Sequence, residues 1–209
     1  MKLSWLKRPE RKFEFPQPPP GFMGRFYMHD PSKEWAAYIP KPSGPTNYLE
    51  IGCADGGNAI IISKSYAHHP ESKLYCVDPW MDYDEYPEYK GDQELAWKAF
   101  NQNIETCADV SKFIIHRGFS DNIVPTFPND FFDLIFVDGN HETEYVYRDG
   151  LMSLDKVKIG GYIVFDDYSD YWPQTVVGID KFVKEAGSRI EIAGNLRYVI
   201  GQMIYKRIA

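Results

Sequence analysis

The carboxylates of Asp138, Asp166 and Asp167 follow two mainly apolar segments of the chain and could together bind a divalent cation. Asp138 comes directly after the run 132–137, and Asp166 and Asp167 come directly after the run 160–165. Runs of this kind are typical of strands buried on both faces of a parallel sheet. Ligands of open α/β sheets bind outside the carboxyl ends of the strands, so we expect the three side chains to converge there. Carboxylates this close repel one another unless a cation lies between them, which predicts a metal site.

A glycine-rich segment after an earlier apolar run is typical of a turn that approaches a ligand. Gly52 and Gly56 are spaced G-x-x-x-G, and Ala54 stands where a dinucleotide cofactor needs a second glycine beside its pyrophosphate. Glu50, two residues before the first glycine, fits a cofactor with a cationic amino-acid portion better than a diphosphate. The alternative is a tight strand-to-helix turn with no ligand.

Two further segments fit contacts with a nucleoside. Asp78 ends the run 73–77 and is placed to accept hydrogen bonds from ribose hydroxyls. This would hold for NAD and for S-adenosylmethionine alike, and the alternative is a solvated loop acid. The segment 116–121 could present a backbone turn and the Ser120 hydroxyl to the edge of an adenine.

Strands and helices that would position these residues alternate from Asn47 onward. We expect strands near 47–51, 73–77, 112–116, 132–137, 160–166, 189–193 and 198–205. We expect helices near 57–67, 91–107, 142–156 and 174–186, with a shorter one near 120–126. This alternation predicts an α/β, Rossmann-like fold, with a seven-stranded, mostly parallel sheet and helices on both faces. No helix separates the last two strands, so a hairpin turning at Gly194-Asn195 would leave the last strand antiparallel.

The first 45 residues differ in composition from the rest. Residues 15–21 are proline-rich and read as extended, whereas Asp30 and Pro31 suit the N-cap and first position of a short helix. We expect an N-terminal arm or linker over 1–45, which packs on the domain or a partner subunit or joins a longer polypeptide. Residues 46–209 would form one domain.

The bulk composition excludes several classes of protein. The net charge is −7, with 30 acidic and 23 basic residues, which argues against nucleic acid as the main partner. The three cysteines lack metal-ligand spacing and suit a reduced, cytoplasmic protein. No apolar run is long enough to span a membrane.

Five motifs in order, within residues 46–206, resemble the class I S-adenosylmethionine-dependent methyltransferases. They are E-x-G-x-x-x-G from Glu50, V-D-P-W from Val77, G-x-S from Gly118, F-V-D-G-N-H from Phe136 and G-G-x-I-V-F-D-D-Y from Gly160. The resemblance implies S-adenosylmethionine as cofactor. It implies contacts to that cofactor from Glu50, Gly52, Cys53, Gly56, Asn58, Asp78, Pro79, Trp80, Phe119, Ser120 and Asp138.

More narrowly, the chain resembles the metal-dependent O-methyltransferases that act on sugars, of the macrocin and rhamnosyl types, and more distantly the catechol O-methyltransferases. The resemblance makes Asp138, Asp166 and Asp167 the ligands of Mg²⁺ or Mn²⁺. Catechol-type enzymes have Asp-Asn where this chain has Asp166-Asp167, whereas the sugar-type enzymes have Asp-Asp. The pair in this chain therefore favours the sugar group. Macrocin-type enzymes favour an aspartate at the position of Asn140, so we interpret His141 instead as the general base, acting beside Asp138.

The expected reaction is methyl transfer to one of two adjacent hydroxyls of a sugar, such as a deoxysugar (rhamnose) in a glycan. The acceptor would lie between two aromatic loops that contribute Tyr83, Tyr86, Tyr168 and Trp172. The alternatives are a catechol or another small phenol as acceptor, or a non-catalytic cofactor-binding partner protein. A nicotinamide-dependent oxidoreductase is disfavoured by the missing glycine. A homo-oligomer, or fusion to another domain through the arm, is also open.

Overall fold

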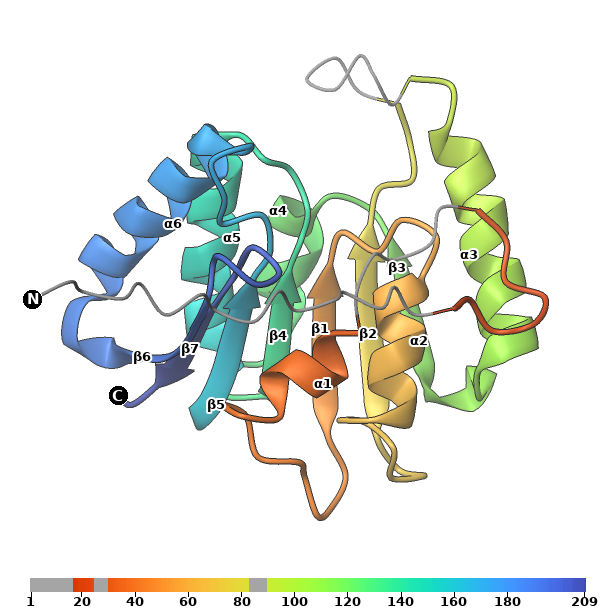
Figure 1. Cartoon of the computed structure of the whole chain (residues 1–209), viewed down its shortest axis with the longest axis horizontal. Coiled ribbons are helices and arrows are strands. Elements are labelled where there is room, and N and C mark those ends of the chain that lie inside the picture. Colours follow the sequence, from red (N-terminus) through yellow and green to blue (C-terminus); the bar gives the residue numbers. More distant parts are fainter. Residues whose placement is uncertain (1–16, 25–29, 83–89) are drawn as a thin grey trace, which may run out of the picture.

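A computed structural model describes residues 17–24, 30–82 and 90–209 and shows a twisted sheet with helices on both faces (Figure 1). The strands are β1 (Asn47–Ile51), β2 (Lys73–Asp78), β3 (Phe113–Arg117), β4 (Phe132–Val137), β5 (Val157–Phe165), β6 (Ile190–Leu196) and β7 (Gln202–Arg207). Their order is β3-β2-β1-β4-β5-β7-β6. The first five strands are parallel, and β7 pairs antiparallel with β5 and with β6. The predicted fold class is confirmed.

Helices cover both faces of the sheet, because successive side chains of a buried strand point to opposite faces and both sets need cover. The main helices are α2 (Gly57–Lys64), α3 (Gln93–Cys107), α5 (Thr143–Lys156) and α6 (Pro173–Ala186), with α1 (Pro31–Trp35) and α4 (Ser120–Ile123) shorter. On β4, Ile135 and Val137 pack in the core under α5 and α6, whereas Leu134 and Phe136 pack with α1 and α2. A third apolar cluster lies between α2 and α3. None of the described helices is long and apolar enough to cross a membrane.

The connection between the last two strands differs from the expectation. The hairpin forms, but Gly194 and Asn195 lie within β6, and the turn falls at 197–201. In this turn the Leu196 carbonyl accepts hydrogen bonds from three amides, and Gly201 has φ +72°. Gly194 serves a different purpose, because a Cβ there would lie 2.7 Å from the Tyr38 ring. A glycine needed for close packing was thus misread as a turn residue.

The described parts of the N-terminal segment pack against the rest of the chain. Asp30 caps α1 as predicted, accepting a hydrogen bond from the Ser32 amide. Trp35 at the end of α1 is fully buried among Tyr66 and Phe136. Nearer the start, Asn103 of α3 hydrogen-bonds both the amide and the carbonyl of Met23. The division at residue 45 into an arm and a domain stays a prediction.

Candidate functional site

The parallel strands place four of the predicted site residues in one row along the carboxyl edge of the sheet. Ile51 pairs with Val77 and Val137, and Val137 pairs with Phe165. The residues that follow or end these strands, Gly52, Asp78, Asp138 and Asp166, are therefore neighbours across the sheet. The amides of Gly52, Asp138 and Asp166 each continue the ladder by donating to a carbonyl at the end of the adjacent strand, those of Val77, Ile51 and Val137. Convergence of the acids at this edge, expected from the sequence, follows from the strand register.

Gly52 is required by the close approach of two strand ends. It has φ +84°, and a Cβ there would lie 1.9 Å from the carbonyl oxygen of Asp138. No side chain fits that space, so the turn after β1 passes directly over the end of β4. The predicted cofactor turn and the predicted metal aspartate are therefore in backbone contact.

Asp78 holds the glycine-rich turn in place through its carboxylate. Oδ2 accepts hydrogen bonds from the amides of Cys53 and Ala54, at 2.8 and 3.0 Å, and Oδ1 accepts one from the amide of Trp80 at 2.7 Å. Burial raises the pKa of Asp78, and the three amide donors act in the opposite direction. The side chain expected to contact ribose thus also fixes the backbone that would surround the cofactor.

Glu50 and Asn58 form a buried polar pair at the base of the cavity. Glu50 Oε2 accepts hydrogen bonds from the Tyr48 hydroxyl at 2.7 Å and from Asn58 Nδ2 at 3.1 Å. Burial raises the pKa of Glu50 to about 8. Asn58 Oδ1 is buried and has no hydrogen-bond partner among the described residues. Asn58 Oδ1, beside the Glu50 carboxyl, is therefore an acceptor available for a cationic or N–H-bearing part of a ligand.

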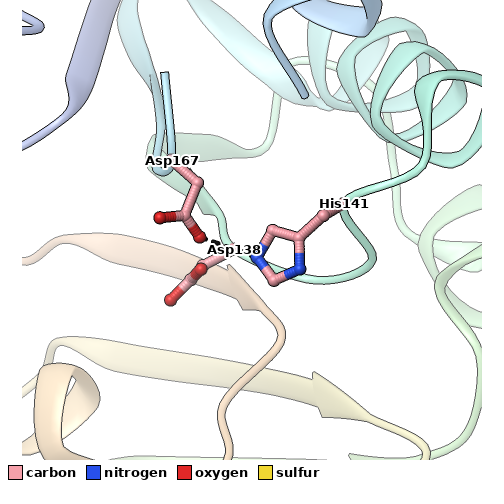
Figure 2. Close-up of side chains that lie close together, drawn as sticks. All are labelled: Asp138, His141 and Asp167. Atoms are coloured by element: carbon pink, nitrogen blue, oxygen red, sulfur yellow. Dashed lines mark hydrogen bonds and ion pairs between the residues drawn. The ribbon is translucent and has the colours of Figure 1, made fainter. Parts of the chain in front are cut away.

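Asp138 and His141, from the loop after β4, meet Asp167, which follows β5, at the same edge (Figure 2). One ligand atom from each lies within 4.8 Å of the others, as in groups that hold a metal ion. His141 Nε2 lies 2.6 Å from Asp167 Oδ2, and its ring stacks on Trp172 with centroids 4.0 Å apart. The predicted metal residue Asp166 is outside this group of three. His141, predicted as a base, is within it.

The charges of the aspartates are coupled. Burial, and then the charges of Asp166 and Asp167, raise the pKa of Asp138 well above its usual range. Burial and the neighbouring Asp167 raise the pKa of Asp166 to about 7. Neighbouring carboxylates that cannot all ionise easily on their own are stabilised together by a divalent cation. The carboxylate oxygens suit Mg²⁺ or Mn²⁺.

One continuous cavity of about 1770 Å³ joins the glycine turn to the carboxylates. This exceeds the 300–1,000 Å³ typical of a pocket for one small ligand, so there is room for two. The sequence-predicted residues that line it are Glu50, Gly52, Cys53, Asn58, Asp78, Pro79, Phe119, Ser120, Asp138, His141, Asp166, Asp167 and Trp172. Tyr171 and Tyr198 add an aromatic rim that the sequence reasoning did not single out as substrate contacts.

Three predicted contacts lie off the cavity wall. Gly56 caps α2 with φ +82° and faces the Phe100 ring. Trp80 is fully buried against Trp97 and Phe100, so it supports the cofactor turn from behind. The Tyr168 hydroxyl bonds Asp180 of α6. Tyr83 and Tyr86 lie outside the described residues.

Asp149 is a cavity-lining acid that the sequence reasoning missed. It lies on α5, is buried, and hydrogen-bonds the side chain of Ser120, and burial raises its pKa to about 7. Its position on the helix was the available signal, because it lies three residues after Val146 and beside Gly150, on the buried stripe. A carboxyl group on the buried face of a helix indicates a polar environment beneath it.

The raised pKa of Glu50 gives a prediction for stability against pH. Between about pH 4.5 and 8 the folded chain keeps a proton that the unfolded chain has released, so stability falls as pH rises through this window. Glu50→Gln should shrink the loss of Tm between pH 5 and pH 9 by at least about 3 °C, since 1 kcal/mol shifts Tm by roughly 2–4 °C at this size. Thermal unfolding in chelator measures this. Glu105→Gln, on α3, is the control, and an equal slope for wild type and Glu50→Gln would contradict the assignment.

Comparison with known proteins identifies the family of this chain. A family model described as a methyltransferase domain matches residues 49–168. The uncharacterized protein R132 of Acanthamoeba polyphaga mimivirus is 43% identical over 143 residues, which cover 66% of this chain and 59% of R132. The chain thus spans about three fifths of the length of this curated relative.

Solved structures share the fold at low identity. The O-methyltransferase NovP superposes with a TM-score of 0.63 and 18% identity, over 86% of this chain and 79% of NovP. The O-methyltransferase TomG of Streptomyces achromogenes, solved in complex with SAM, gives 0.58 and 16%, over 78% of this chain and 74% of TomG. The family match covers more than half of the chain and includes the glycine turn and all three site aspartates. The chain therefore belongs to the family of methyltransferase-domain proteins.

Proposed function

We propose that this chain is a divalent-metal-dependent O-methyltransferase that transfers the methyl group of S-adenosylmethionine to a hydroxyl of a sugar bearing two adjacent hydroxyls. One observation carries the proposal above the others. The glycine turn (residues 52–56) meets the aspartate–histidine cluster of Asp138, His141 and Asp167 within a single cavity. The point of contact is between Gly52 and Asp138. A methyl donor on the turn and an acceptor at the cluster would then be neighbours, which is the proximity that methyl transfer requires.

The residues at the turn fit the methyl donor. Glu50 and the unpartnered Asn58 Oδ1 suit an amino-acid portion with its ammonium group. Asp78 shapes the turn and keeps a cavity-facing edge for ribose hydroxyls. Phe119 and Ser120 line the part of the cavity where adenine would lie. When bound, the methyl donor would supply a methyl group on a sulfonium centre, and these residues would hold that centre beside the cluster.

The three aspartates at this edge fit a cation that orients the acceptor. Asp138, Asp166 and Asp167 would supply oxygen ligands, and the coupling of their charges supports occupation by a divalent ion. The bound cation would acidify and align two adjacent hydroxyls. His141, oriented by Asp167 and by stacking on Trp172, would take the proton from the reacting hydroxyl.

The aromatic rim favours a sugar as acceptor. Trp172, Tyr171 and Tyr198 line the cavity beside the cluster, and the last two are 91% and 84% exposed. Exposed aromatic faces of this kind offer stacking surfaces for a sugar ring. A catechol or other small phenol is the second candidate, because it also presents two adjacent hydroxyls.

The test is methyl transfer from labelled S-adenosylmethionine to rhamnose-containing glycans and to catechols, each with Mg²⁺ or with a chelator. Chelator-sensitive transfer to a sugar supports the proposal in full. Transfer to catechols alone moves the protein to the phenol group. Equal transfer in chelator contradicts the metal role. Tight cofactor binding without turnover on any acceptor would revive the reading of a non-catalytic partner.

The two possible roles of His141, base or metal ligand, give different results on substitution. If it is the base, His141→Ala should lower turnover by about 100-fold at pH 7 and by much less at pH 9, where hydroxide partly replaces it. The affinity for Mn²⁺, measured by electron paramagnetic resonance, should stay within about threefold of wild type. A loss of Mn²⁺ affinity with a pH-independent drop in turnover would make His141 a ligand. His116→Ala, on β3, is the matched control.

A further inference from the structure

A series of hydrogen bonds connects the N-terminal helix α1 to one of the proposed metal ligands. The Trp35 indole Nε1–H donates to Gln202 Oε1 at 2.7 Å. Gln202 Nε2 donates to Asp166 Oδ1 at 3.2 Å, and the Asp167 amide donates to the same oxygen at 3.0 Å. Trp35 and Gln202 are 0% and 1% exposed, so bulk water does not compete for the bond between them.

The donor-to-acceptor direction of these hydrogen bonds is fixed by the two groups at the ends of the series. An indole nitrogen can only donate, so the amide oxygen of Gln202 must face Trp35. The amide NH₂ of Gln202 must then face Asp166, which it meets as a donor. This donor fixes the orientation of the Asp166 carboxylate. Both hydrogen bonds that Asp166 accepts from described residues are made at Oδ1, and this leaves Oδ2 for a cation.

We propose that Gln202 and Trp35 are positioning residues of the metal site: Trp35 orients the amide of Gln202, which in turn holds Asp166 ready for the cation. This rests on the proposed function, because it assigns Asp166 as a ligand. It adds that the segment before residue 46 contributes to the centre. Groups that orient metal ligands in this way are typically worth 10- to 100-fold in metal affinity.

The test is Mn²⁺ binding to the full chain, measured by electron paramagnetic resonance without methyl donor or acceptor. Gln202→Met keeps the side-chain volume but removes the donor, and should weaken Mn²⁺ binding about 10-fold or more. Trp35→Phe should weaken it about threefold to 10-fold, because Gln202 remains but loses its orienting partner. Tyr66→Phe is the matched control: it removes a hydrogen bond to the Ile39 carbonyl within the same core and touches no carboxylate.

The double variant separates positioning from packing. If Trp35 acts through Gln202, Trp35→Phe should cost no further Mn²⁺ affinity in the Gln202→Met background. Methyl-donor affinity, measured by calorimetry, should stay within about twofold in all variants, which shows that the fold is kept. The proposal is overturned if Gln202→Met binds Mn²⁺ as wild type does, if Tyr66→Phe loses as much, or if the Trp35 effect persists in the double variant. Absence of Mn²⁺ binding by the wild type would instead refute the metal site itself.

Discussion

Asp138→Ala is expected to lose turnover by about 1000-fold or more while the affinity for S-adenosylmethionine changes by less than about fivefold. The reason is that Asp138 belongs to the aspartate–histidine cluster, whereas most of the contacts expected for the methyl donor come from other residues, among them Glu50, Asn58 and Asp78. Loss of a cation that stabilises the reacting oxygen is worth several kcal/mol of activation free energy, which corresponds to this factor. Single-turnover kinetics and calorimetry measure the two quantities.

The same substitution should raise the stability of the protein in chelator. Burial and the charges of Asp166 and Asp167 oppose ionisation of Asp138, so its removal relieves a cost that the folded state bears without a cation. Asp138→Asn tests this at constant volume and should show an equal or higher Tm.

Asp133→Asn, at the opposite end of the same strand, is the matched control and should keep wild-type turnover. Turnover of Asp138→Ala near that of wild type would end the metal proposal.

Gly52→Ala is expected to destabilise the fold by about 4 kcal/mol or more. The new Cβ would meet the Asp138 carbonyl oxygen at 1.9 Å, so β1 and β4 would have to separate at their ends. The left-handed backbone adds roughly 1–2 kcal/mol of strain. Against a total of 5–15 kcal/mol, this brings the chain close to unfolding at 25 °C. Urea unfolding gives the free energy, and titration with the methyl donor shows whether the turn still binds.

Gly160→Ala is the control that isolates the clash. Gly160 has φ +85°, against +84° for Gly52, but a Cβ there meets no heavy atom within 4 Å. It should therefore cost only the backbone strain, about 1–2 kcal/mol. Equal losses for the two variants would show that strain, and not the approach of β4, makes glycine necessary at Gly52.

The row of site residues was predictable because it follows from local patterns. Apolar runs ending in acids identified β2, β4 and β5, and parallel strands bring their carboxyl ends to one edge without further information. Gly52, Asp78, Asp138 and Asp166 could thus be placed in space from residue types and strand order alone. The strand bounds of β1 and β4 were also correct to the residue.

Contacts between distant segments were not predictable in the same way. Trp80 was assigned to the cofactor from its motif, yet its ring packs in the core. Asp149 and Gln202 reach the cavity through the packing of α5 and the pairing of β7, and neither is marked by a motif. His141 shares a cluster with Asp167 because the loop after β4 bends toward the end of β5, which spacing along the chain does not reveal.

The bond between Trp35 and Gln202 also bears on the order in which the protein can fold as it is synthesised. The two residues are 167 positions apart. Gln202 lies on β7, which is the last strand along the sequence. At 5–20 residues per second, Trp35 leaves the peptidyl-transferase centre roughly 8–33 s before its partner is made. Asp167 precedes Gln202 by 35 residues, or roughly 2–7 s at the same rate, so β1 to β5 with Asp138, His141 and Asp167 are all synthesised before Gln202 exists. In that interval the indole group remains without its native acceptor, and an early-folded intermediate would have a carboxylate cluster without the bond from Gln202 to Asp166.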